Sequence, residues 1–259
     1  MTADWRSRID SAVDDAVDRM IELRRRMHAN PEPSGAELRT SLHLYQLFDS
    51  LGLAVQMGPE GCGVVVESRN QKAARRIALR GDIDALRIQD QKLTPYRSTV
   101  PEVMHACGHD AHTATVFGAA TALDRLEREA ALPWPVTWRS IFQPAEETGA
   151  GARSMIAAGA LKDVSAILSM HVDPTRRAGT IGVRPGVLTA SCDTMRVIVR
   201  GRGGHAARPH ESDDPIAAAA ELISTLYQYV PRATDSQDAV VVSFGQIHGG
   251  QNSNVIPEE

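Results

Sequence analysis

The sequence predicts an α/β fold with a mainly parallel sheet and helices on both faces, followed by a smaller α+β unit. Between residues 63 and 172, short apolar runs typical of strands alternate with stretches of helical periodicity. After Pro185 the pattern changes to a strand, a long helix and a second strand. The chain has 259 residues, of which 42% are hydrophobic, so it is long enough for two domains.

Helices are expected first. Near the N-terminus, hydrophobic residues recur at helical spacing: Val13, Val17, Met20, Ile21 and Met27. Ser34 and Glu37 form an S-x-x-E pattern, which predicts a capping box at the start of a second helix. Gly52 is expected to end that helix.

Strands and helices then alternate. The predicted strands lie in GVVVES (63–68), RRIALRGDID (75–84), VTWRSIFQPAEE (136–147) and AILSMHV (166–172). Helices are expected from about residue 110 to 129 and from about 152 to 158. Later, TMRVIVRG (194–201) and AVVVSFGQI (239–247) are predicted strands on either side of a helix that starts at Asp214-Pro215. We therefore expect one domain over 1–187 and a second over 188–259.

The composition excludes several classes of protein. The net charge is −4 and the pI is near 6.1, and no basic run marks a nucleic-acid or anionic-membrane partner. A small neutral or anionic substrate is more natural. The N-terminus interleaves acids with apolar residues and lacks the core of a signal peptide, and the three cysteines are too scattered for a disulfide framework. These features predict a cytoplasmic protein.

Side chains that bind metal follow the predicted strands. The stretch MHACGHDAH (104–112) alone holds a cysteine, three histidines and an aspartate. The other candidates are Asp82 and Asp84, Glu146 and Glu147, and His171. Because ligands of open α/β sheets bind beyond the carboxyl ends of the strands, these residues are expected to converge on a site for one or two divalent metals. If Glu147 binds metal, Glu146 is placed to act as the general base.

Each candidate also has a purely structural interpretation. Cys107 could be a small buried hydrophobe, and His171 a core histidine with its hydrogen bonds satisfied. His105 and His112 could bond the backbone or orient a ligand. The two aspartates could cap the next helix, and the two glutamates could form a solvated turn. A further alternative makes Cys107 the nucleophile of a thiol amidase, which leaves the paired glutamates unexplained.

Ordered motifs along nearly the whole chain resemble one family. They are RRRMHANPEPSGAE, RGDIDAL, MHACGHDAHTA, FQPAEETGAGARSMI, SMHVDP, GRGGHAARPH with DDPI, and GGQNSNVIP. The sequence resembles the metal-dependent amidohydrolases and peptidases that include hippurate hydrolase, N-acyl-amino-acid amidohydrolases, auxin-conjugate hydrolases and, more distantly, carboxypeptidase G. The resemblance implies a zinc-peptidase-like catalytic domain, a ferredoxin-like lid that forms a homodimer, and two metal ions (Zn, Mn, Co or Ni).

The resemblance also implies roles for individual residues. It assigns the metal ligands Cys107, His109, Glu147 and His171. Glu146 is the implied acid/base, and Asp84 orients the site. His205 is expected to support the oxyanion across the dimer, although it could be a plain turn residue. Asn254 is expected near the substrate.

The chain departs from the family pattern at several places. Arg87 stands where proline is usual, and Glu102 where glycine is usual. The family continues past the NVIP motif with a further histidine ligand, so both domains are expected to be incomplete here. The expected activity is hydrolysis of the amide of N-acyl amino acids. The alternative is a homologue that binds metal or small carboxylates without turnover.

Overall fold

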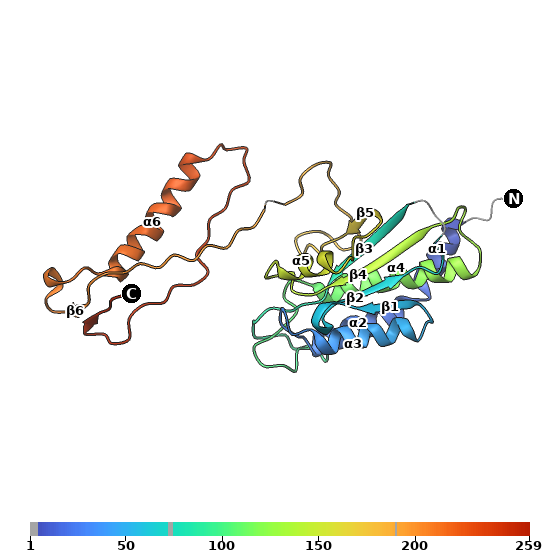
Figure 1. The fold of residues 1–259 in the computed structure, drawn as a ribbon, viewed down its shortest axis with the longest axis horizontal. Helices are drawn as coiled ribbons and strands as arrows, with labels where there is room; N and C mark the ends of the chain where they lie inside the picture. The colour runs from blue at the N-terminus through green and yellow to red at the C-terminus, as the bar shows by residue number, and fades with distance from the viewer. Residues whose placement is uncertain (1–4, 72–74, 190) are drawn as a thin grey trace. The chain divides into compact units, whose positions relative to one another are not determined.

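Five strands form one sheet (Figure 1), and four of them lie in the predicted apolar runs, whereas the strand at residues 54–57 was not predicted. The structure is a computed structural model that describes residues 5–71, 75–189 and 191–259. In the order of the sheet the strands are β1 (Ala54–Met57), β2 (Val64–Glu67), β4 (Thr137–Gln143), β3 (Arg76–Asp82) and β5 (Val164–Ser169). Strand β3 is parallel to both β4 and β5, whereas β1 and β2 form an antiparallel edge. The mostly parallel sheet is confirmed for the strands that precede the candidate site.

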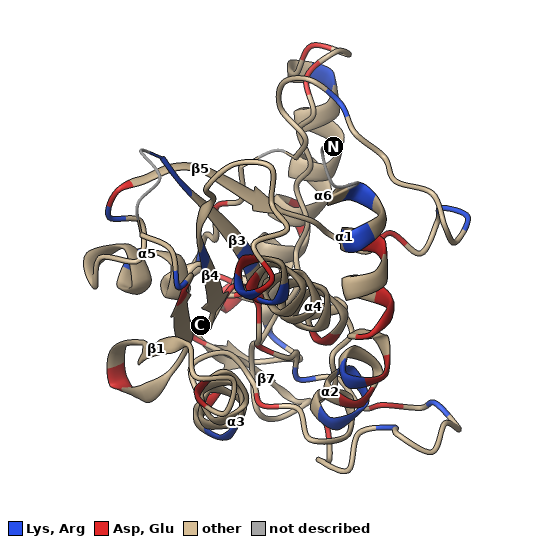
Figure 2. Ribbon diagram, turned by 90° about the vertical axis from the view of Figure 1, so that its right-hand side faces the viewer, with Lys and Arg blue, Asp and Glu red and all other residues tan. Residues whose placement is uncertain are grey.

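Helices cover both faces of the sheet, as predicted. They are α1 (Trp5–Asp14), α2 (Val17–Ala29), α3 (Leu38–Asp49), α4 (His109–Arg128) and α5 (Ala150–Ala157). Figure 2 shows α4 and α5 on opposite sides of β3 and β4. On the α3 and α4 face, the ring of Phe48 lies 5.3 Å from the rings of both Phe117 and Phe142. On the other face, Met155 packs against Val65 and other buried residues of the sheet.

Two details of the N-terminal helices differ from the prediction. The periodic stretch is not continuous, because α1 ends at Asp14 and α2 begins at Val17. The predicted capping box is wrong. Helix α3 begins at Leu38, and Glu37 precedes it without a side-chain capping hydrogen bond. The Ser34 hydroxyl instead donates to the Asp84 carboxylate at 2.7 Å, and the Glu37 carboxylate accepts from the Ala145 amide. Both side chains of the motif therefore bond to residues far away in the sequence.

Residues 178–259 form a second compact unit, and 1–177 form the first. The predicted helix is present as α6 (Pro215–Ala233), and the Asp214 carboxylate accepts hydrogen bonds from the Ile216 and Ala217 amides. The strands predicted over 194–201 and 239–247 are not formed in the described residues. Instead the short strands β6 (Gly204–His205) and β7 (Val255–Ile256) pair. High strand propensity is not sufficient, because a strand also needs a neighbouring backbone to bond.

Short 3₁₀ turns, η1 (Pro59–Gly61) and η2 (Pro209–Glu211), complete the secondary structure of the described residues. None of the helices in this part of the chain is both long and apolar enough to cross a membrane. The predicted division between 1–187 and 188–259 remains a prediction about the functional domains, and the contact pattern of the chain divides at Arg177.

Candidate metal centre

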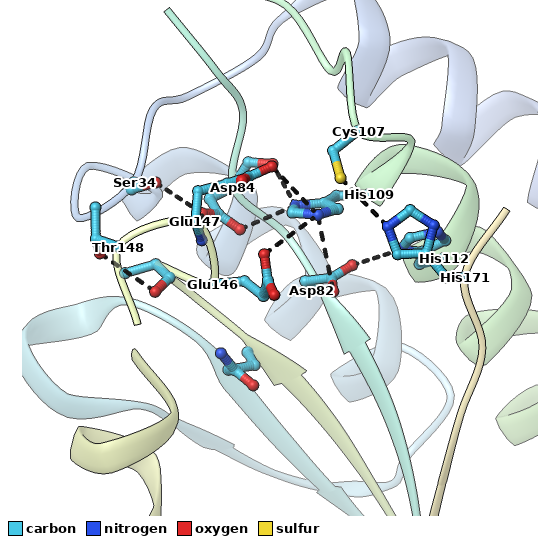
Figure 3. Close-up of polar contacts among 12 residues, drawn as sticks. Ser34, Asp82, Asp84, Cys107, His109, His112, Glu146, Glu147, Thr148 and His171 are labelled. Atoms are coloured by element: carbon cyan, nitrogen blue, oxygen red, sulfur yellow. Dashed lines mark hydrogen bonds and ion pairs between the residues drawn. The ribbon is translucent and has the colours of Figure 1, made fainter. Parts of the chain in front are cut away.

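The carboxyl ends of the three parallel strands bring together the predicted site residues of the first unit (Figure 3). Asp82 is the last residue of β3, and Glu146 follows β4 by three positions. His171 follows β5 by two positions, and His109 is the first residue of α4. Parallel strands end at one edge of a sheet, so side chains distant in sequence meet there. The convergence expected from the sequence is therefore present.

Three sets of three side chains could each hold a metal ion, because within each set the ligand atoms lie within 4.8 Å of one another; His109 belongs to all three. One set joins it to Cys107 and His171, and a second joins it to Glu146 and Glu147. Together these two sets contain all four predicted ligands. The third set combines His109 with Asp82 and His112, to which the family resemblance assigned no ligand role.

The His109 imidazole is oriented to offer one nitrogen to a cation. Its Nδ1 lies 2.9 Å from the Asp84 carbonyl oxygen and 3.0 Å from Asp84 Oδ1, so Nδ1 carries the proton and donates. Its Nε2 is buried and has no hydrogen-bond partner among the described residues. That nitrogen lies 3.7 Å from an oxygen of Glu146 and 3.7 Å from one of Glu147. A buried nitrogen without a partner is costly, and a metal ion would satisfy it.

His171 is oriented in the same way. Its Nδ1 donates to the Val172 carbonyl oxygen at 2.7 Å, which leaves Nε2 free to accept. Nε2 lies 3.3 Å from Cys107 Sγ. An oxygen fixes the proton of each imidazole on Nδ1. Both histidines therefore offer the lone pair of Nε2 to a metal ion, as metal-ligating histidines commonly do.

The charges around these donors favour a cation. Burial would lower the pKa of His109, but the Asp84 hydrogen bond and the surrounding carboxylates raise it to about 9. Burial and the neighbouring Glu147 raise the pKa of the Cys107 thiol to about 12. A thiol that attacks without a cation needs a lowered pKa, so this environment does not favour the thiol-amidase alternative. Nitrogen, sulfur and carboxylate donors together suit a divalent transition metal.

Asp84 links three parts of the site. Its Oδ1 accepts from His109, and its Oδ2 accepts from the Ser34 hydroxyl at 2.7 Å and from the Glu147 amide at 3.0 Å. Burial would raise the pKa of Asp84, but these hydrogen bonds lower it. The interpretation of the aspartates as helix caps is wrong, because Gly108 precedes α4 and no side chain caps that helix.

Asp82 and His112 form a buried pair that the sequence did not predict. His112 Nε2 accepts from the Val172 amide at 3.0 Å, so its Nδ1 donates to Asp82 at 2.7 Å. Burial would raise the pKa of Asp82, but the His112 hydrogen bond and the nearby charges of His109 and Arg80 hold it at about 2. The pair connects the end of β3 to the segment beside His171. The i+3 spacing of His109 and His112 on one helix was the available signal.

His105 has neither of the roles that the sequence left open for it within the described residues. It is 4% exposed, and neither ring nitrogen has a hydrogen-bond partner there. Burial lowers the pKa of His105 to about 4, so the ring is neutral near pH 7.

Gly108 permits Cys107 and His109 to face the same site. Its φ is +88°, a conformation that disfavours residues with a Cβ. A Cβ atom there would lie 2.4 Å from Val172 Cγ2. Glu102, where glycine was expected, also has a positive φ of 55°. The backbone before α4 therefore adopts the conformation for which glycine is the usual choice, even where a glutamate stands.

His205 and Asn254 lie beside each other in the second unit. The two-residue strand that ends at His205 pairs with Val255, and the Ala206 amide donates to the Asn254 carbonyl oxygen at 3.1 Å. His205 Nδ1 accepts from the Ala207 amide at 3.1 Å. Their roles toward an oxyanion and a substrate remain predictions.

A mostly parallel sheet with nitrogen, sulfur and carboxylate donors at the carboxyl ends of its strands is an arrangement that can hold a divalent metal. The model of Peptidase family M20/M25/M40 matches residues 78–251, and the chain belongs to that family. The N-acetylcysteine deacetylase of Bacillus subtilis is 43% identical over 93% of this chain and 63% of its own length. The IAA-amino acid hydrolase ILR1-like 5 of Arabidopsis thaliana is 38% identical over 95% of this chain and 55% of its own length.

Solved structures agree with this assignment. A putative aminohydrolase from methicillin-resistant Staphylococcus aureus is 30% identical and superposes with a TM-score of 0.75, covering 96% of this chain and 66% of its own. The YXEP protein of Bacillus subtilis, described as a dinuclear metal binding peptidase of the M20 family, is 37% identical with a TM-score of 0.68. That match covers 95% of this chain and 62% of the other. The chain spans 63% and 61% of the first two curated relatives.

Proposed function

We propose that this protein hydrolyses the amide bond of N-acyl amino acids or related small conjugates. The observation that carries the proposal is the convergence of Cys107, His109, Glu147 and His171 around the unpaired Nε2 of His109, with Glu146 beside them. The named activities of the similar deacetylase and conjugate hydrolase support this substrate class. Both descriptions name bonds between an acyl group and an amino acid.

The four ligands would hold a divalent ion, with two ions (Zn, Mn, Co or Ni) in the complete site. Such an ion polarises a carbonyl group and lowers the pKa of water to about 7. Figure 3 shows Cys107 and His171 on one side of His109 and Glu147 on the other. The Glu147 backbone amide donates to the Asp84 carboxylate, and this hydrogen bond fixes the position of the backbone from which the Glu147 side chain extends.

Glu146 acts as the general acid and base. Its side chain is 39% exposed, so substrate and water can reach it, while its oxygen is 3.7 Å from His109 Nε2. Burial raises the pKa of Glu146, and Asp82 and Glu147 act in the same direction, although His109 opposes them. A raised pKa suits a carboxylate that takes a proton from water and then gives it to the leaving nitrogen. His205 supports the oxyanion and Asn254 contacts the substrate in a homodimer.

The test is the substitution Glu146→Gln. We expect it to abolish hydrolysis of N-acetylcysteine, hippurate and an indole-acetyl amino acid, while metal content per chain stays at the wild-type value. Glu147→Gln is the matched control and should lower metal content. Turnover retained by Glu146→Gln would refute the role of Glu146. Metal binding with no hydrolysis by the wild type would favour binding without turnover.

A further inference from the structure

The turn that carries Glu146 and Glu147 has an unusual backbone. Ala145 has a φ of 47°, in the left-handed region that residues with a Cβ seldom adopt. The start of α5 packs directly against this turn, because a Cβ on Gly151 would lie 1.6 Å from the Pro144 carbonyl oxygen. A strained turn persists only when surrounding contacts hold it, so its hydrogen bonds identify the residues that maintain it.

Glu37 supplies one of those hydrogen bonds. Its side chain is fully buried, and its Oε1 accepts from the Ala145 amide at 2.8 Å and from the Gly35 amide at 3.0 Å. The backbone of Glu37 is itself held, because its carbonyl oxygen accepts from the Ser41 hydroxyl at 2.6 Å. The same hydroxyl accepts from the Gly63 amide at 2.8 Å. The carboxylate is thus anchored between α3 and the segment that leads into β2.

We propose that Glu37 is a positioning residue, whose carboxylate holds the Ala145 turn so that Glu146 faces the Nε2 of His109. The proposal rests on the function proposed above for Glu146. It also gives a role to the glutamate of the S-x-x-E motif, which does not cap α3. A buried acceptor 108 residues away in the chain fixes the start of the catalytic turn.

The two glutamates of the turn depend on different anchors. The Glu147 amide donates to Asp84, whereas the Ala145 amide, one residue before Glu146, donates to Glu37. Loss of the Glu37 acceptor leaves the Ala145 amide without its partner, although the Ala145 carbonyl oxygen still accepts from the Gly151 amide and the Thr148 hydroxyl. The side of the turn that leads to Glu146 is therefore held less firmly, while Glu147 stays tied to Asp84. We expect the general base to move while the metal ligand keeps its place.

The experiment compares three variants of the natural polypeptide. Glu37→Met has a similar length but no acceptor, and Glu37→Gln keeps an oxygen that can accept both amides. Glu32→Met is the matched control, because Glu32 is also buried in this loop but its carboxylate accepts from the Arg39 and Thr40 amides. It therefore reports the effect of weakening the same loop without releasing the turn.

Glu37→Met is expected to lower kcat by about 10–100-fold, because small displacements of a catalytic group cost up to about 100-fold. KM should stay within about threefold of the wild-type value. Metal content should equal that of the wild type, since the metal ligands keep their anchors. Glu37→Gln should restore kcat to within about threefold of the wild type, and Glu32→Met should lower the Tm while leaving kcat within the same range. Equal kcat values for Glu37→Met and Glu32→Met would contradict the positioning role and show that Glu37 has only a structural role.

Hydrogen exchange of the Ala145 amide separates this proposal from the proposed function. The amide should exchange faster in Glu37→Met than in the wild type and Glu32→Met, whether or not any substrate is turned over. Unchanged exchange overturns the role of Glu37. Faster exchange with unchanged kcat overturns it as well. An inactive wild type, or an active Glu146→Gln, overturns the proposed function, and the exchange rates still decide whether Glu37 holds the turn.

Discussion

Asp84→Asn tests whether the hydrogen bonds beneath His109 set metal affinity. The wild-type carboxylate accepts on both oxygens, from His109 on one and from Ser34 and Glu147 on the other. The side chain of an asparagine has only one oxygen. Whichever way its amide is turned, its NH₂ group meets either the Nδ1–H of His109 or the backbone N–H of Glu147. The substitution keeps the size of the side chain and removes one acceptor.

The expected loss follows from that geometry. A hydrogen bond to a charged group contributes about 1.5–3 kcal/mol. Since a tenfold change in affinity corresponds to about 1.4 kcal/mol, the loss of one such bond should weaken metal binding by about 10–100-fold. Substitutions of groups that orient a metal-ligating histidine have effects of about this size.

The assay is competition of the protein with a chromophoric chelator for Zn²⁺ or Mn²⁺. Asp124→Asn is the matched control, because Asp124 is also buried and accepts from arginines, at the other end of α4. It lies about 22 Å along the helix from His109. Metal affinity equal in Asp84→Asn and Asp124→Asn would refute the reasoning that Asp84 orients His109 and Glu147.

Two other predictions concern stability. Gly108→Ala should destabilise the fold by about 1–3 kcal/mol more than Gly159→Ala in urea unfolding. Both glycines have a positive φ, but of the two only Gly108 lacks room for a Cβ, so equal losses of stability would contradict this. Burial would raise the pKa of Asp90, but the Ser98 and Lys92 amides and the Lys92 ammonium hold it at about 2, and His28 also faces it. Because the folded pKa lies below an unfolded value of about 3.9, its stabilisation is present above that pH and is lost as the pH falls toward 2. The urea midpoint of the wild type should therefore fall toward that of Asp90→Asn between about pH 4 and pH 2, and parallel curves would contradict it.

Local patterns explain what could be predicted from the sequence. Apolar runs predicted the strands before Asp82, Glu146 and His171, and the parallel arrangement of those strands followed from the helical segments between them. The Asp214-Pro215 start of α6 was also predicted, because an N-cap depends on neighbouring residues alone. The corresponding prediction for Ser34 and Glu37 failed, because buried partners far away in the chain compete for both side chains.

The sequence by itself determined the family, the α/β class and the set of donors, since these depend on residue types and short-range spacing. Only the tertiary structure decided how the donors are oriented. That orientation depends on hydrogen bonds between residues at least 25 positions apart in the chain. They join His109 Nδ1 to Asp84, His112 to Asp82, and the Ala145 amide to Glu37. Such contacts depend on how strands and loops pack together, and no local periodicity encodes them.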